Sequence, residues 1–173
     1  MFKNTGGSTP FPLKDNCLDP QEGIDLHHYV TDLTLDEFVD IIHVHLADEL
    51  RTTDVVEDED GYVQSLNCVS GQSILKVTPQ ELWGSDSPCD VFSLDLQLTS
   101  SLKHIDLLTV NDINKNSPGL KVYLDDNCLH SSAVLCTKFG VTGQTVVNEI
   151  AFLVRSGQHL LLALHKKAGE SVN

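Results

Sequence analysis

The chain has 173 residues and a mass of 19.0 kDa, with 40% hydrophobic and 21% charged residues. This length and composition predict one globular domain with a core of its own. The net charge of −14 and the pI near 4.7 argue against nucleic acid and anionic membranes as partners.

Residues 1–31 are expected to form a flexible N-terminal arm, because glycine and proline recur through them. A single domain is expected over residues 32–168, with a C-terminal tail at 169–173. Thr34 and Glu37 have the spacing of a capping box, so a helix is predicted from Thr34 to about Leu50. Its buried stripe would hold Leu35, Phe38, Val39, Ile42, Leu46 and Leu50.

An acidic turn at residues 57–61 lies between two strand-like runs and predicts a β-hairpin. Residues 73–77 predict a short strand. Residues 91–98 predict a half-buried strand, because apolar and polar residues alternate along it. The polar segment 79–90 between them is predicted to be a connection, and it holds the only tryptophan, Trp83.

Residues 101–115 predict a middle helix, residues 120–137 a second hairpin, and residues 142–165 a long final helix. Gly157 interrupts the final helix and marks either a bend or a close contact. The predicted order is helix, three strands, helix, two strands, helix. Such an order predicts an α+β domain in which an antiparallel sheet has its helices packed on one face.

The second half of the chain resembles the YbjN-like group, which shares the type III secretion chaperone-like fold. The resemblance lies in residues 110–114 at the end of the middle helix, in residues 121–127 of the hairpin, and in residues 140–142 before the last helix. Ile113 stands where that group has an aromatic residue. The resemblance implies an acidic, cytoplasmic, often dimeric protein without catalytic residues. Members are described as chaperones or as sensory-transduction regulators that hold other proteins.

The five cysteines are odd in number and contain no CxxC, so neither a disulfide framework nor a zinc knuckle is predicted. Buried thiols in a reducing compartment are expected instead. The N-terminus lacks the apolar core of a signal peptide, and no apolar run approaches a membrane span. A cytoplasmic location without membrane contact is therefore expected.

Patterns that support chemistry are weak in this chain. His43 and His45 point apart on a helix, and the acidic turn has the wrong residues for an EF-hand. Residues 140–145 lack the lysine of a phosphate-binding loop, and no GxSxG occurs. We therefore expect no enzyme, no metal site and no cofactor.

One candidate partner site lies on the first helix, where Ile41 and Val44 fall outside the buried stripe among Glu37, Asp40 and Asp48. An apolar spot ringed by acids suits a basic amphipathic segment. The alternative is that these are ordinary scattered surface hydrophobes. Residues 1–60 hold 15 acidic side chains against 3 Lys and Arg, so this end of the chain is strongly acidic.

A second candidate surface lies on the middle helix, where Leu107 and Val110 point away from the stripe of Leu102, Ile105 and Ile113. A helix that is apolar on two sides is buried on both, so we predict a homodimer through this helix. The expected function is a non-enzymatic protein-binding module, chaperone-like or regulatory. The alternatives are an assembly module that acts only through self-association, and a small-molecule-binding domain.

Overall fold

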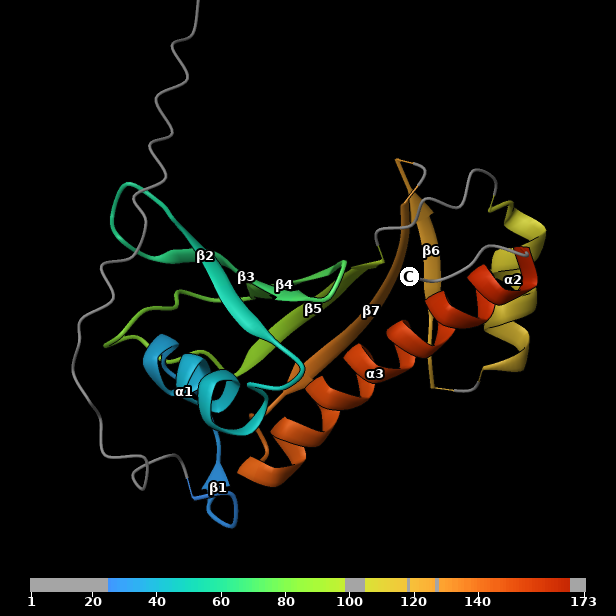
Figure 1. Ribbon diagram of the computed structural model, residues 1–173. Helices are drawn as coiled ribbons and strands as arrows, with labels where there is room; N and C mark the ends of the chain where they lie inside the picture. Colours follow the sequence, from blue (N-terminus) through green and yellow to red (C-terminus); the bar gives the residue numbers. More distant parts are fainter. Residues whose placement is uncertain (1–24, 99–104, 118, 127, 169–173) are drawn as a thin grey trace, which may run out of the picture.

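The protein is an α+β domain built on one six-stranded antiparallel sheet (Figure 1). The computed structural model describes residues 25–98, 105–117, 119–126 and 128–168. The strand order in the sheet is β2-β3-β4-β5-β7-β6, and β1 pairs separately with β8. The elements in chain order are β1 (Tyr29–Val30), α1 (Leu35–His45), β2 (Arg51–Glu57), β3 (Val63–Ser70), β4 (Ser73–Pro79), β5 (Val91–Leu98), α2 (Leu107–Asn116), β6 (Val122–Asp125), β7 (Cys128–Cys136), β8 (Val141–Thr142) and α3 (Gly143–Ala168).

The α+β class and the antiparallel sheet are confirmed, but the predicted order of elements was wrong in two respects. Four strands, β2 to β5, separate α1 from α2 where three were predicted. The short strands β1 and β8 were not predicted, because a two-residue pairing leaves no periodic pattern in the sequence. Since β1 belongs to residues 25–31, this last part of the predicted arm is tied to the domain.

The core lies on one face of the sheet, which we call the inner face. The alternation predicted for β5 is confirmed, since Phe92, Leu94, Leu96 and Leu98 are each at most 1% exposed. Helix α3 packs on this face across β5 and β7, and α1 covers the end of it nearer to β2 (Figure 1). Burial of this apolar surface supplies the main driving force for folding.

An aromatic cluster fastens α1 to the inner face. The ring of Phe38 lies 5.5 Å from that of Trp83 and 5.2 Å from that of Phe92, measured between centroids. Trp83 is fully buried and donates its indole N–H to the carbonyl of Leu33 at 2.9 Å. The segment 79–90 therefore supports α1 through its buried Trp83, although its polar composition predicted a simple connection. The capping box of Thr34 and Glu37 is present as predicted.

The helix α2 lies against the edge strand β6, and its buried Val110 belongs to the same core cluster (Figure 1). The Asn114 side chain donates to the carbonyl of Val122 at 2.9 Å and accepts from its N–H at 2.8 Å. This amide group takes the place of a neighbouring strand and satisfies both backbone groups of an edge residue. Helix α2 therefore covers the edge of the sheet at β6.

Gly157 of α3 is a close contact with the sheet, which decides between the two alternatives that the sequence left open. A Cβ atom at this position would lie 2.9 Å from Cδ2 of Leu98 and closer still to Cδ2 of Leu96. Both leucines are fully buried. The absence of a side chain therefore lets α3 approach β5 directly.

Candidate functional site

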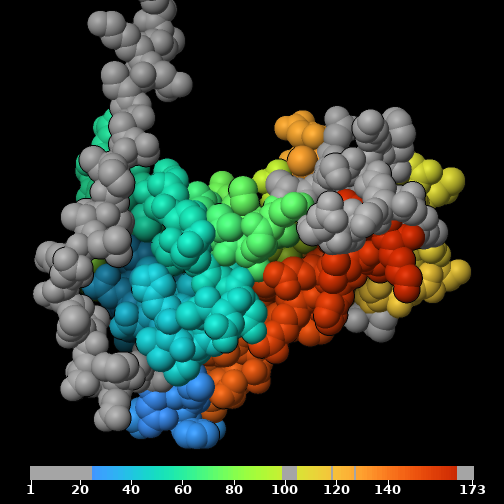
Figure 2. All heavy atoms as spheres, viewed as in Figure 1, coloured from blue at the N-terminus to red at the C-terminus, as the bar shows by residue number. Residues whose placement is uncertain are grey.

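The opposite, outer face of the sheet carries no helix among the described residues, and it is hollowed into a shallow groove. The groove has a volume of about 320 Å³. In Figure 2 the surface over the green residues of β4 sinks between β2 on one side and the orange end of β7 on the other. Side chains of five strands line the groove: Thr53, Asp54, Asn67, Val69, Ile74, Lys76, Asp95, Gln97 and His130.

Strand register arranges the outer face in rows that run across the sheet. One row passes from β3 to β6 through Val69, Ile74, Gln97, His130 and Tyr123, each opposite the next. Neighbouring strands are about 4.8 Å apart, so this row is about 19 Å long. It places one side chain from every strand of the six-stranded sheet except β2 on a common line.

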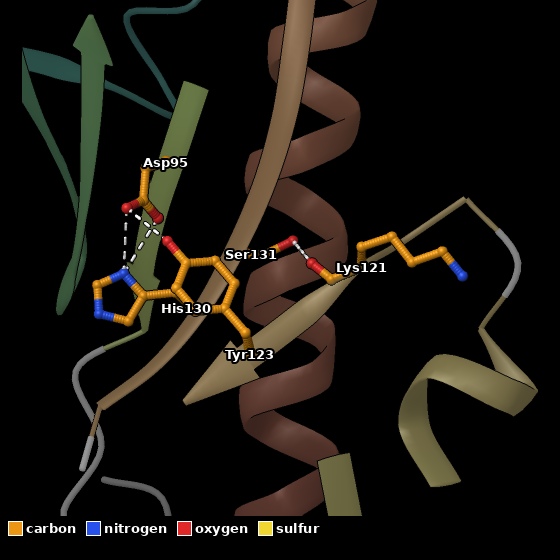
Figure 3. Close-up of polar contacts among 5 residues, drawn as sticks. All are labelled: Asp95, Lys121, Tyr123, His130 and Ser131. Atoms are coloured by element: carbon orange, nitrogen blue, oxygen red, sulfur yellow. Dashed lines mark hydrogen bonds and ion pairs between the residues drawn. The ribbon is translucent and has the colours of Figure 1, made fainter. Parts of the chain in front are cut away.

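A polar network closes the β6 end of the groove (Figure 3). The carboxylate of Asp95 accepts the Tyr123 hydroxyl at 2.9 Å and lies 3.0 Å from Nδ1 of His130. The two rings stack with their centroids 5.1 Å apart and their planes inclined by 23°. Three strands, β5, β7 and β6, are thus joined through side chains as well as through the backbone.

The network holds Tyr123 in its protonated form over an unusually wide pH range. Burial raises the pKa of Tyr123 to about 12, and the hydrogen bond to Asp95 and the charges of Asp95 and Asp125 act in the same direction. A phenolate beside two carboxylates would be repelled, so the phenol remains a donor to Asp95.

A carboxylate that holds one ring nitrogen of a histidine also occurs in catalytic triads. Within the described parts of the chain, however, no hydroxyl or thiol is hydrogen-bonded to the other ring nitrogen of His130. The same described residues contain no group of three or more His, Cys, Asp or Glu arranged to hold a metal ion. The visible role of the network is to position side chains at the groove.

The partner site predicted on α1 is only partly exposed. Ile41 is fully buried, so the prediction that it belongs to a surface spot was wrong. It lies three residues after Phe38 on the same side of the helix, and segment 79–90 widens the buried side beyond the predicted stripe. Val44 is 49% exposed, and Glu37 and Asp48 are exposed, but Val44 alone does not form an apolar patch.

Asp40 on the same helix is half-buried and carries an electrostatic cost. Burial raises its pKa above the ordinary value, and the charges of Asp36 and Glu37 raise it further, while His43 lowers it. The acidic side of α1 is therefore a region of mutual repulsion within the folded protein.

Of the two residues predicted for the dimer surface on α2, one is buried and one is exposed. Val110 is 5% exposed and packs into the core of its own chain, so its assignment to an interface was wrong. Leu107 is 70% exposed, and Leu108, which the sequence analysis did not select, is 77% exposed. Of the predicted inner stripe, Leu102 lies outside the described residues.

The outer-face residues were missed as a site, although part of the signal was present. The alternation in β5 placed Asp95 and Gln97 on the polar side of one strand. Their neighbours His130 and Tyr123 come from a hairpin some 30 residues later, and only strand register brings them together.

Comparisons with family models, with curated proteins and with solved structures each find no match for this chain. The resemblance to the YbjN-like group therefore remains a prediction. Among the described helices, none is both long and apolar enough to cross a membrane.

Proposed function

We propose that this protein is a non-enzymatic protein-binding module, chaperone-like or regulatory, that docks a segment of a partner protein on the outer face of its sheet. The observation that carries this proposal is the groove on a sheet face that no described helix covers. Apolar side chains stand exposed on this face, with Val134 at 68%, Tyr123 at 39% and Ile74 at 38%. Exposed apolar groups beside polar ones are typical of interaction surfaces.

The spacing of the outer-face row suits an amphipathic helix laid across the strands. Strands are about 4.8 Å apart, and side chains three or four residues apart on a helix are separated by about 5–6 Å. Successive apolar side chains of the partner would then meet Val69, Ile74 and the Tyr123–His130 stack in turn. The polar groups of Gln97 and Asn67 would fix its register.

The resemblance to the YbjN-like group supports the chaperone-like or regulatory character of this proposal. The free thiols of Cys68, Cys89, Cys128 and Cys136 support a reducing compartment, and we propose that the protein acts in the cytoplasm. The acidic charge of the chain supports a protein as the partner and disfavours a polyanion.

The test is a photo-reactive amino acid placed at Gln97 in the groove, with Glu149 on the exposed side of α3 as the matched control position. A defined adduct with a second protein is expected at Gln97 and not at Glu149, as identified by mass spectrometry. Val134→Asp, an exposed change on the same face, should reduce the adduct while leaving thermal stability unchanged. Equal labelling at both positions, or none at Gln97, would refute docking on this face.

A second candidate is an assembly module that acts through self-association, and it is favoured by the adjacent exposed side chains of Leu107 and Leu108. If this candidate holds, sedimentation at micromolar concentration will show a dimer that Leu107→Asp with Leu108→Asp dissociates. Photo-crosslinking at Gln97 would then give either no adduct or an adduct with a second copy of this chain only.

A further inference from the structure

The β6 end of the groove combines an aromatic ring with two carboxylates, and we call Tyr123, Asp95 and Asp125 the Tyr123 platform. Asp125 lies two residues after Tyr123 on β6 and therefore projects from the same face of the sheet. Asp95 is bonded to the phenol from β5. The ring and the two carboxylates each attract a cation, and they lie together at this end of the sheet.

One face of the Tyr123 ring is occupied and the remainder is accessible. His130 stacks on the ring from β7, which among the described residues is the one strand paired with β6. Tyr123 is nevertheless 39% exposed, and Asp125 is exposed. The accessible part of the ring is therefore the part that His130 does not cover.

No cationic side chain of the described chain is recorded as an ion-pair partner of Asp125. Figure 3 shows the side chain of Lys121 extending away from Tyr123 and Asp95, while the Lys121 carbonyl accepts a bond from Ser131 at 3.1 Å on the other side of the sheet. Lys76 lies on β4 directly opposite Asp95, whereas β4 and β6 are three strand spacings apart, which is about 14 Å. Asp95 thus has His130 and Lys76 beside it, and among the described residues Asp125 is the carboxylate of the platform that is left for a cation from outside.

We infer that the Tyr123 platform receives an arginine side chain from the docked partner segment. The planar guanidinium can stack on the exposed ring while it donates hydrogen bonds to the carboxylate of Asp125. The hydrogen bond that Tyr123 donates to Asp95 fixes the ring in the orientation that such stacking needs. Charge complementarity with a chain of net charge −14 favours the same cation and would speed the encounter.

This inference rests on the proposed function, because the arginine belongs to the docked segment. The first step of the test selects twelve-residue peptides from a random display library against the wild-type chain. Enrichment of arginine at one position is expected. Selection of no peptide, or of peptides without arginine, would overturn the inference.

The second step measures binding of one selected peptide by fluorescence polarisation, with the peptide in which citrulline replaces arginine as the neutral counterpart. On the wild-type chain, citrulline should weaken binding by about tenfold, the product of a cation–π contact and an exposed ion pair. On Asp125→Asn and on Tyr123→Leu the same replacement should cost at most about threefold.

Glu149→Gln removes the same charge from α3, away from the platform, and should leave the tenfold effect intact. An equal loss with citrulline on the wild-type chain and on both platform variants would show that the arginine binds elsewhere. Each variant must retain its thermal unfolding transition for its binding to count. If the Gln97 adduct is still obtained while the arginine effect is absent, docking on the outer face stands and the platform inference alone fails.

Discussion

Replacing Gly157 by alanine tests how closely α3 approaches the sheet. The new methyl carbon would lie 2.9 Å from Cδ2 of Leu98, whereas carbon atoms in contact are about 3.5–4.0 Å apart. Both Leu98 and Leu96 are fully buried, so their terminal methyl groups can yield only toward other atoms of a close-packed core. Such overpacking costs about 1–3 kcal/mol.

An opposing effect makes the sign of this prediction informative. Alanine is a better helix former than glycine by about 0.8–1.0 kcal/mol, so an unhindered Gly157→Ala would stabilise the protein. The overlap should outweigh this gain and give a net loss of up to about 2 kcal/mol, which is up to about 8 °C in Tm for a chain of this size. The assay is urea unfolding followed by the fluorescence of the single, buried Trp83.

Two variants separate crowding from other effects of the substitution. Leu96→Val removes a methylene group beside Gly157, so the double variant should be more stable than the sum of the two single losses predicts. Gly84→Ala, where an added Cβ has no neighbour within 4 Å, should be nearly neutral. A Gly157→Ala protein as stable as the wild type, or more stable, would refute the close contact.

Three further predictions concern titrating groups. Burial and the charge of Asp36 raise the pKa of Asp40, so ionisation of this carboxyl destabilises the folded protein as the pH rises above about 3.8. Asp40→Asn should therefore raise Tm slightly at neutral pH and leave it unchanged below pH 4. A lower Tm at neutral pH would contradict this. The Asp106 carboxylate caps α2 by accepting the N–H of Thr109 at 2.8 Å, which lowers the pKa of Asp106. Asp106→Ala should lower Tm above pH 4. Asp106→Asn should keep the helix cap but lose the dependence of Tm on pH. Tyrosinate absorbance should show one of the three tyrosines titrating near pH 12, and Tyr123→Phe should remove that step. Asp95→Asn should move it to lower pH, and an unchanged step would contradict the role of the carboxylate.

Local signals in the sequence determined the parts of the fold whose pattern repeats within a few residues. The capping box at Thr34, the alternation from Val91 to Leu98 and the turn at Asp60-Gly61 each depend on near neighbours. They gave the α+β class and most of the strands and helices. They failed for Ile41 and Val110, because burial of a helix side depends on which distant segment packs against it.

The sequence by itself determined that the chain is acidic, of single-domain size, and built from an alternating strand among helices. Tertiary structure alone decided which residues share the outer face, because a one-residue shift in register would move Asp95, His130 or Tyr123 to the other side of the sheet. It also decided that α2 closes the β6 edge through Asn114 and leaves the outer face without a described helix. The candidate site is a product of long-range register, for which no short stretch of sequence carries a signal.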